Sequence, residues 1–386
     1  ATPHYHSAAP ISGLAEPAKV EFGFEMTVTR VEESPRITKP FSDAVWAAMD
    51  ALGDRVDADL VAQDVRLTMG GEPTFVSIDD FEAPEWNIAA VGPSKRGLAD
   101  KLIRRLRDRF APGGMLHYGQ GKWYPGESLP RWAFALYWRR DGRPIWRDAD
   151  LIAREDAPKS ADADAARKLI DAVAGHFGLG DYVMPAYEDP AHWEEKTAEL
   201  PVNVTTQEAK SGSVEFDSRI SRVYERGLGN PAGFVLPLAS LPTGKDGDSD
   251  RVWISEKWVF RRGQAFLVPG DSPLGFRLPL SSLPYVPPEH YPYYQPQDPL
   301  EPRGPLPDDP KAATVVNGAG ITGVAVRTAL AIEPRDGIVR VFMPPTQRAD
   351  EYLELAAHLE AAAAELALPI HVEGYEPPYD ARIGLI

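Results

Sequence analysis

The chain has 386 residues, 43% of them hydrophobic and 25% charged, a composition typical of folded proteins that excludes global disorder. Its formal net charge of -16 argues against a nucleic-acid partner, although a local basic pocket in an acidic protein can still bind an anion such as ATP. The absence of cysteine excludes disulfides, thiolate metal sites and thiol nucleophiles, and it fits a reducing, cytoplasmic location.

The sequence shows no sign of membrane insertion or export. No stretch approaches the roughly 18 uninterrupted apolar residues of a membrane span, and the first residues lack the zones of a signal peptide. We therefore expect a soluble chain with no membrane partner, and we interpret its start as the cut edge of a longer protein. The length predicts two or three domains.

The first elements are predicted between residues 20 and 110. Residues 20–31 alternate as a β-strand does, and residues 65–78 predict two strands broken by a pair of glycines. Ser42 and Ser94 are suitable N-caps for two amphipathic helices, the second ending before Pro112. The apolar stripes of the two helices are Val45, Met49, Leu52, Val56 and Leu60 in the first, and Leu98, Leu102, Leu106 and Phe110, expected to be buried, in the second.

The next elements lie between residues 132 and 190. Residues 132–138 predict a strand buried on both faces, and Asp141-Gly142 predicts a hairpin turn toward Ile145-Trp146. Residues 165–177 predict a helix that ends at a glycine, and Asp189-Pro190 predicts the start of a short helix.

The region after residue 240 begins with a polar loop, residues 240–250. Residues 252–260 and 265–268 then predict a hairpin around Arg262-Gly263. Residues 284–310 are rich in proline and tyrosine, and they predict a linker or a surface strap because proline lacks a backbone donor.

The C-terminal part has the clearest pattern. Residues 324–332 and 338–342 flank Asp336-Gly337, a strong hairpin signal, and an alanine-rich helix and a strand from Ile370 follow. The expected fold class is α+β, with a mostly antiparallel sheet and flanking helices. The predicted divisions are a lead-in and strand (1–40), a core segment (41–283), a Pro/Tyr-rich linker (284–312) and a ββαβ subdomain (313–386).

Two stretches near the N-terminal half have residues suited to metal and phosphate binding. Glu72 follows two glycines at a strand end, where a carboxylate suits Mg²⁺; a tight turn with a solvated Glu is the alternative. In residues 116–127, the backbone at Gly119 and Gly121 together with Lys122 could cradle a phosphate, and Arg131 could support it; an aromatic-rich structural loop is the alternative.

Two further stretches carry paired charges. Asp271 and Arg277 lie in successive turns, where an Arg suits a carboxylate or phosphate, or where the two residues pair to hold the loop together. Arg327 and Glu333 are evenly spaced around an apolar strand, which places them on one side of a sheet, or simply at its exposed ends. The sequence has no paired-histidine zinc motif and no GxSxG serine-hydrolase motif.

Several long segments together resemble a bacterial family of predicted amidoligases, which follow a transglutaminase-like domain in one polypeptide. The family is assigned the glutamine-synthetase-like fold of carboxylate–amine ligases. The segments that carry the resemblance are LTMGGEPTFVSIDD (Leu67–Asp80), FAPGGMLHYGQGKWYPGE (Phe110–Glu127), LVPGDSPLGFRLPL (Leu267–Leu280), RTALAIEPRDG (Arg327–Gly337), VFMPP (Val341–Pro345) and EGYEPPYDARI (Glu373–Ile383).

The resemblance implies ATP, Mg²⁺ and an acyl-phosphate intermediate attacked by an amine. The implied partners are a nucleotide and a carboxylate and amine pair, including peptide or protein substrates. Glu72 is then the metal candidate and Glu333 a second metal or amine-side residue. Gly119, Gly121, Lys122 and Arg131 would contact phosphate, and Asp271, Arg277 and Arg327 the substrate.

One departure bears on activity. Relatives continue past the EGYEPP segment into an acidic strand and a Gly-rich, Asn-His motif, so we expect this chain alone to lack part of the site. A non-catalytic peptide-binding module is the main alternative function. An amide hydrolase is the last, because the sequence shows no nucleophile for it.

Overall fold

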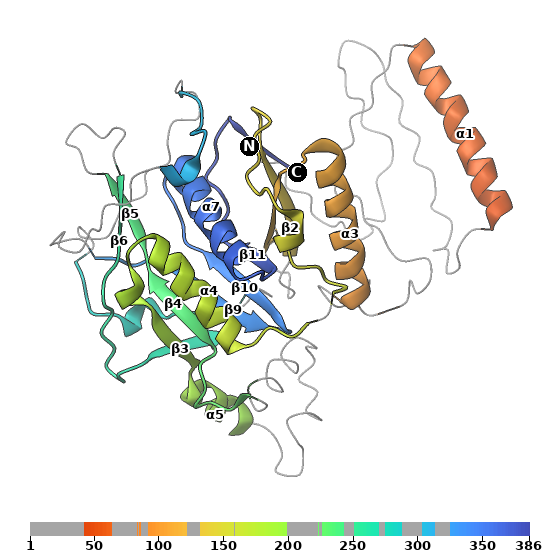
Figure 1. Cartoon of the computed structure of the whole chain (residues 1–386). Coiled ribbons are helices and arrows are strands. Elements are labelled where there is room, and N and C mark those ends of the chain that lie inside the picture. The colour runs from red at the N-terminus through yellow and green to blue at the C-terminus, as the bar shows by residue number, and fades with distance from the viewer. Residues whose placement is uncertain are drawn as a thin grey trace, which may run out of the picture. The chain divides into compact units, whose positions relative to one another are not determined.

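The computed structural model describes residues 42–63, 83, 85, 92–121, 132–157, 159–198, 223, 226–242, 251–269, 275–287, 303–312 and 325–386 (Figure 1). The chain divides into two compact units, Ala1–Asp79 and Asp80–Ile386. The described part of the first unit is helix α1 (Asp43–Ala62), and all other described elements belong to the second. None of the described helices combines the length and the apolar character needed to cross a bilayer.

The second unit is built on a ten-stranded sheet in the order β12-β2-β1-β11-β10-β9-β4-β3-β7-β8, with a separate pair, β5-β6. Most neighbours are antiparallel, and β1-β11, β10-β11 and β3-β7 are parallel. The predicted α+β class with a mostly antiparallel sheet is thereby confirmed. The strands are β1 (Met115–Gln120), β2 (Trp132–Arg139), β3 (Met184–Glu188), β4 (Gly233–Pro237), β5 (Ala239–Pro242), β6 (Arg251–Ile254), β7 (Ala265–Pro269), β8 (Phe276–Arg277), β9 (Ala329–Arg335), β10 (Ile338–Met343), β11 (Ile370–Gly374) and β12 (Ile383–Leu385).

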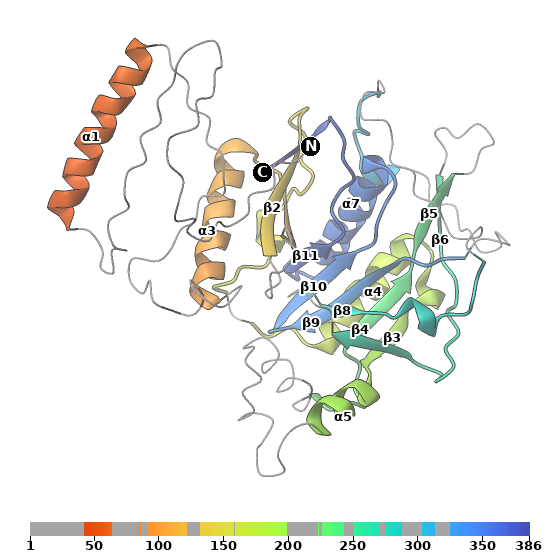
Figure 2. The ribbon, with the colours of Figure 1, turned by 180° about the vertical axis from the view of Figure 1, so that it is seen from behind.

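Two helices cover one face of this sheet, which we call the helix face. Strands β9 and β10 direct Ile332 and Val341 to it, both fully buried, and α4 and α7 lie side by side over these strands (Figures 1 and 2). The opposite side, the pocket face, carries Ala331, Phe342 and Glu373, which are register neighbours on β9, β10 and β11. The helices of this unit are α3 (Pro93–Phe110), α4 (Ala163–His176), α5 (Pro190–Ala198) and α7 (Ala349–Glu365), with 3-10 turns at Ala149–Leu151, Gly180–Tyr182, Leu280–Ser282 and Pro310–Ala312.

Local sequence signals place several elements correctly. Ser42 caps α1, Asp189 accepts a hydrogen bond from Ala191 N at the start of α5, and α4 ends beside Gly178 at a φ of +65°. Asp336 and Gly337 both have positive φ, 54° and 69°, as the tight turn between β9 and β10 requires. The order β9-β10-α7-β11 confirms the predicted ββαβ succession.

The prediction for α3 is wrong at its start and on its buried face. The N-cap is Gly92 rather than Ser94, because Pro93 suits the first helical position. Leu98, Leu102 and Phe110 are 51%, 55% and 64% exposed, and of the predicted stripe Leu106 alone packs against the core. The buried side chains are Asp100, Ile103 and Arg107. The two charged residues can be buried because Asp100 accepts a hydrogen bond from the Tyr118 hydroxyl and Arg107 donates one to the Gly114 carbonyl.

Both predicted hairpins in the middle of the chain are also wrong. Strand β2 pairs with β1 and β12, while Ile145 and Trp146 donate their N–H groups to the Gly113 carbonyl. Gly263 does turn the chain at a φ of +75°, but the strand before it, β6, pairs with β5 and the strand after it, β7, pairs with β3 and β8. A turn signal in the sequence shows where the chain changes direction. It does not show which strands pair on either side of the turn.

Some predictions fall on residues that the structure does not describe or describes differently. The strands predicted at 20–31 and 65–78 lie outside the described residues. The segment predicted as a loop from residue 116 is in its first part the strand β1, which pairs with β2 and β11. The polar loop predicted from residue 240 begins later than expected, because residues 239–242 form β5.

Candidate functional site

A cavity of about 180 Å³ opens on the pocket face, and we call it the sheet pocket. Strands β4 and β9 contribute Val235, Ala329 and Ala331, whose side chains are directed to this face by the cross-strand register. The charged residues that line it are Arg277, Arg327 and Glu333. Larger aromatic and aliphatic side chains line it as well: Trp258, Leu267, Phe276, Leu278, Phe342 and Tyr375.

The two arginines of the pocket are held differently. The Arg277 guanidinium lies over the Phe342 ring, 5.2 Å from its centroid, and donates to the Phe276 carbonyl at 3.3 Å. The Arg327 guanidinium donates to the carbonyls of Val326 and Pro284 at 3.1 and 2.9 Å and lies 3.8 Å from the Glu256 carboxylate. Arg327 is therefore fixed against the backbone.

Glu333 belongs to a chain of ionisable side chains that runs across β9, β10 and β11. We call it the Glu–Arg network (Glu333, Arg335, Glu373, Arg340 and His371). Arg335 donates to Glu333 at 2.5 Å and to both oxygens of Glu373 at 2.6 and 2.9 Å. Arg340 lies 3.8 Å from Glu373 and donates to Nδ1 of His371 at 3.1 Å. The opposite ring nitrogen of His371 then donates to the Ala153 carbonyl at 2.8 Å, which fixes a neutral tautomer.

Burial and neighbouring charges shift the pKa values of this network in opposite directions. Burial alone would lower the pKa of Arg335, but Glu373 and Glu333 outweigh it and raise that pKa above its ordinary value. Burial and the Arg335 charge lower the pKa of Arg340 to about 10. Burial and the Arg340 charge also keep the pKa of His371 well below its ordinary value, in agreement with the neutral tautomer.

A smaller cavity adjoins the sheet pocket at Glu333. It is lined by Glu188 and Arg226, which form an ion pair, and by Gly275 and Arg335. A Cβ atom on Gly275 would lie 2.8 Å from the Glu333 carboxylate, and Gly275 has a φ of +34°. On the other side, a Cβ on Gly233 would lie 3.0 Å from the Glu333 Cβ. The absence of a side chain at Gly275 and Gly233 therefore provides the space that the Glu333 carboxylate occupies.

The structure brings together three of the residues proposed from the sequence. Arg277, Arg327 and Glu333 come from two distant segments and line the same pocket. Gly119 lies within β1, beside the His117 ring, and Gly121 follows that strand; neither is among the residues that line the sheet pocket. Glu72, Lys122, Arg131 and Asp271 lie outside the described residues, so their roles stay predictions.

Sequence reasoning missed the residues that hold Glu333 in place. Arg340, His371 and Glu373 alternate with buried apolar residues along their strands, and Arg335 lies two positions after Glu333. This spacing of two puts the ionisable side chains on one face. Charged residues at this spacing in three separate apolar strands would have been the signal. Glu188, at the end of β3, gave no comparable pattern.

Within the part of the chain that the structure describes, no group of three acidic or histidine side chains is placed to hold a metal ion. Glu333 is already bonded to Arg335, and Glu373 to Arg335 as well. The described residues therefore fit an anionic ligand with an apolar part, recognised by arginines, and do not by themselves fit Mg²⁺.

Comparison with known proteins gives a family. The model of the family described as "Putative amidoligase enzyme (DUF2126)" matches residues 16–386 of the chain. A search of curated proteins and a search of solved structures each returned no match.

Proposed function

The chain belongs to this amidoligase family, and we therefore propose that it acts as an ATP-dependent carboxylate–amine ligase whose substrate carboxylate binds at the sheet pocket. The observation that supports this reaction is the convergence of Arg277, Arg327 and Glu333 on one pocket. Cations beside a single carboxylate are the groups needed to bind an acid and to deprotonate an amine.

The proposed reaction proceeds in two steps. A carboxylate oxygen of the substrate attacks the γ-phosphorus of ATP, so that an acyl phosphate forms and ADP leaves. The amine nitrogen then attacks the acyl carbon, the bond from that carbon to the phosphate oxygen breaks, and inorganic phosphate leaves. Phosphorylation is needed because a carboxylate by itself has no adequate leaving group.

We assign different parts of this reaction to the two kinds of residue. Arg277 pairs with the substrate carboxylate, and Arg327 supplies fixed positive charge near it. Glu333 accepts the proton that the amine loses on attack, since its carboxylate lies in the pocket and is held by Arg335. Arg335, Glu373 and Arg340 are positioning residues.

Mg²⁺ is proposed for this enzyme because it neutralises phosphate charge in such reactions when bound. The proposal depends on Glu72, which would have to supply a ligand that the described residues lack. Lys122 and Arg131 are proposed to contact the phosphates.

The reaction can be tested without knowing the amine. Hydroxylamine attacks any acyl phosphate and yields a hydroxamate that is measured by colour with Fe³⁺. We expect the protein, given Mg·ATP and a mixture of amino acids and small carboxylic acids, to form hydroxamate only when ATP and acid are both present. Calorimetry with Mg·ATP tests nucleotide binding in parallel. A protein that neither binds ATP nor forms hydroxamate would not be this ligase.

Variants separate the two proposed roles. Arg277→Gln should abolish most hydroxamate formation, whereas Arg140→Gln, at an exposed position, should leave it unchanged. Glu333→Gln should slow ligation of an ordinary amine about 10²–10⁴-fold. It should slow hydroxamate formation much less, because hydroxylamine is already uncharged near pH 7 and does not have to be deprotonated before it attacks. The matched control is Glu365→Gln at an exposed helix end.

A pair of glycine variants tests the position of Glu333 without altering its chemistry. Gly275→Ala would place a methyl group 2.8 Å from the Glu333 carboxylate. Gly263 also has a positive φ, +75° against +34° at Gly275, but a Cβ atom there would meet nothing within 4 Å. We expect only Gly275→Ala to slow ligation. Equal effects of the two substitutions would show that backbone strain, and not the Glu333 position, controls the rate.

A further inference from the structure

The sheet pocket has a preformed apolar lining in addition to its charged residues. Trp258, 8% exposed, is fixed because its indole N–H donates to the Val326 carbonyl at 2.9 Å. It packs in a cluster with Val235 and Leu267, against which Phe276 and Leu278 also lie. These contacts form a wall whose shape does not depend on a ligand.

Small residues on the strands create the space next to this wall. The pocket-face positions of β9 are Ala329 and Ala331, where the corresponding helix-face positions are Leu330 and Ile332. Gly233, in the same pocket, faces Glu333 across the strand pair, and a Cβ atom there would lie 2.7 Å from the Ile332 carbonyl. A larger residue at any of these positions would fill the cavity or displace its neighbours.

The cavity has the size of an aromatic ring. Its volume is about 180 Å³. A dry cavity of roughly 150 Å³ lined by aliphatic and aromatic side chains is large enough to bind benzene. Since the lining is mostly apolar, the group that enters it gains more from leaving water than a polar group of the same size would.

The Arg277 guanidinium lies directly beside the apolar wall. Arg277 follows the wall residue Phe276 directly and lies over the Phe342 ring, and both rings line the pocket. A guanidinium has five N–H donors, so Arg277 can keep its protein partners and still bind a ligand carboxylate. A ligand that satisfies both features has a carboxylate adjacent to an apolar, ring-sized group.

We infer that the sheet pocket selects a carboxylate substrate with an aromatic-sized apolar side chain, such as an aromatic amino acid or a peptide that ends in one. The ring lies between Trp258, Ala331 and Leu278, and the carboxylate pairs with Arg277. That the bound acid is a substrate rests on the proposed ligase function, whereas the binding preference does not.

The preference is tested by calorimetric titration of the whole chain without ATP. The probes are N-acetyl-L-phenylalanine, N-acetyl-L-alanine, N-acetyl-L-aspartate and N-acetyl-L-phenylalaninamide. The first should bind at least about tenfold more tightly than each of the others, which lack either the ring or the free carboxylate beside it. Equal affinity for all four probes, or no binding of the first, would overturn the inference.

Variants locate the binding at this pocket. Ala331→Leu should abolish the preference for the ring while leaving a weak carboxylate response, and Arg277→Gln should abolish the preference for the acid over its amide. The controls are Ala364→Leu and Arg140→Gln, at exposed positions. Ala329→Val is a smaller filling substitution that reports on the same wall, and thermal melts verify that each variant is folded. Tight binding that survives both filling variants would place the probe elsewhere and contradict the inference.

The outcomes for binding and for the ligase reaction can be distinguished. Ring selectivity together with a failure to bind ATP would contradict the ligase and retain the pocket assignment. Hydroxamate formation without ring selectivity would support the ligase function and contradict the inference about the pocket.

Discussion

Arg335 bonds to two carboxylates at once, Glu333 on its own strand and Glu373 two strands away. The side chains are 11%, 14% and 1% exposed. A buried ion pair of this kind is weak evidence for stability, since desolvation offsets much of the attraction. Its clearer consequence is that the Glu333 carboxylate has a fixed position in the pocket.

Removing Arg335 leaves both carboxylates buried without their main cation. We expect Arg335→Met to lower the free energy of unfolding by roughly 3–5 kcal/mol, measured by urea denaturation at neutral pH. Arg154→Met is the matched control, because Arg154 pairs with Asp156 on an exposed surface and should contribute little. Equal losses for the two variants would contradict the role assigned to burial.

His117 gives the described region a pH dependence. It is fully buried beside the Tyr137 ring, and burial lowers its pKa to about 4, although Glu373 and a backbone group of Tyr375 offset part of that effect. Because the pKa falls on folding, the unfolded chain binds the proton more readily. The contribution of His117 to the free energy of unfolding is therefore fully present above the unfolded pKa of about 6.5. It is lost as the pH falls from there toward the folded pKa of about 4.

This titration can be measured against a variant that cannot titrate. Between pH 7.5 and pH 5 the His117 contribution should fall by about 2 kcal/mol, given its folded pKa and the ordinary unfolded value. His117→Phe keeps a ring against Tyr137 and should show a pH-dependent loss that is smaller by that amount. Burial lowers the pKa of His358 to about 4 and raises that of Glu354 to about 7, but these groups titrate alike in both proteins. Parallel pH profiles would show that His117 does not titrate as proposed.

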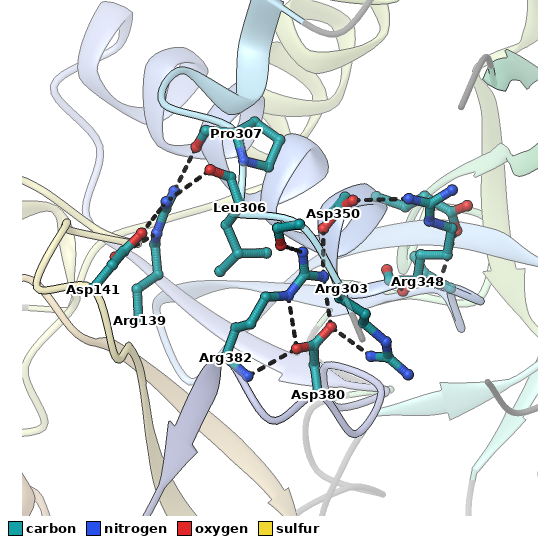
Figure 3. A network of polar contacts seen from close by, with 12 residues as sticks. Arg139, Asp141, Arg303, Leu306, Pro307, Arg348, Asp350, Asp380 and Arg382 are labelled. Atoms are coloured by element: carbon teal, nitrogen blue, oxygen red, sulfur yellow. Dashed lines mark hydrogen bonds and ion pairs between the residues drawn. The ribbon is translucent and has the colours of Figure 1, made fainter. Parts of the chain in front are cut away.

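At the scale of elements, residues 303–312 form a strap held by arginines. Arg139 donates to the carbonyls of Leu306 and Pro307 at 3.3 and 2.7 Å (Figure 3). Arg382 donates to the Gly304 carbonyl at 2.8 Å. Asp380 accepts from Arg303 and Arg382, and these bonds hold its pKa at about 2 although burial would raise it. This carboxylate therefore links the strap to the turn before β12.

Replacing Asp380 should release the strap. Asp380→Asn leaves two arginines without their shared carboxylate, so we expect a loss of roughly 2–4 kcal/mol in unfolding free energy. Hydrogen exchange should become faster at residues 303–312 and 380–386. Asp308→Asn is the control on the same strap, since Asp308 is exposed and pairs with Arg143 at the surface. Unchanged exchange in the strap would show that Asp380 does not anchor it.

Sequence reasoning succeeded for elements whose determinants are local. The β9–β10 turn needs two residues that tolerate positive φ, and Asp336-Gly337 supplies them within the turn itself. It failed for α3, where Arg107 is buried because it reaches carbonyls of Gly114 and Trp146, the latter far along the chain. Partners of that kind cannot be found from the spacing of apolar residues.

The same limit applies to the candidate site at the scale of the whole molecule. Arg277 could be proposed from its charge in a predicted turn, and Arg327 and Glu333 from their charge and strand spacing. The pocket that they share depends on which strands are neighbours. Strand β4 lies next to β9, and β1 next to β11, although long segments separate them in sequence. Local patterns give no information on such pairing.

The strand order also allows a test of the predicted C-terminal subdomain, residues 313–386. In the sheet, β2 and β1 lie between β12 and β11, while β9 pairs with β4 and α7 packs against α4. The outer edge of β9, the outer edge of β11 and one edge of β12 are thus completed by strands from before residue 313, and α7 packs against a helix from before it. Alone, this piece would expose unpaired strand edges and the apolar side of α7, which costs more than its remaining contacts provide.

We therefore expect the isolated 313–386 fragment to lack a cooperative unfolding transition, whereas the full chain should show one. Circular dichroism in increasing urea and the dispersion of amide signals in an NMR spectrum measure this directly. A fragment with a sigmoidal transition and dispersed amides would establish the boundary predicted at residue 313. A fragment without them would mean that the Glu–Arg network, whose five residues all lie after that boundary, forms only when the earlier strands complete the sheet around it.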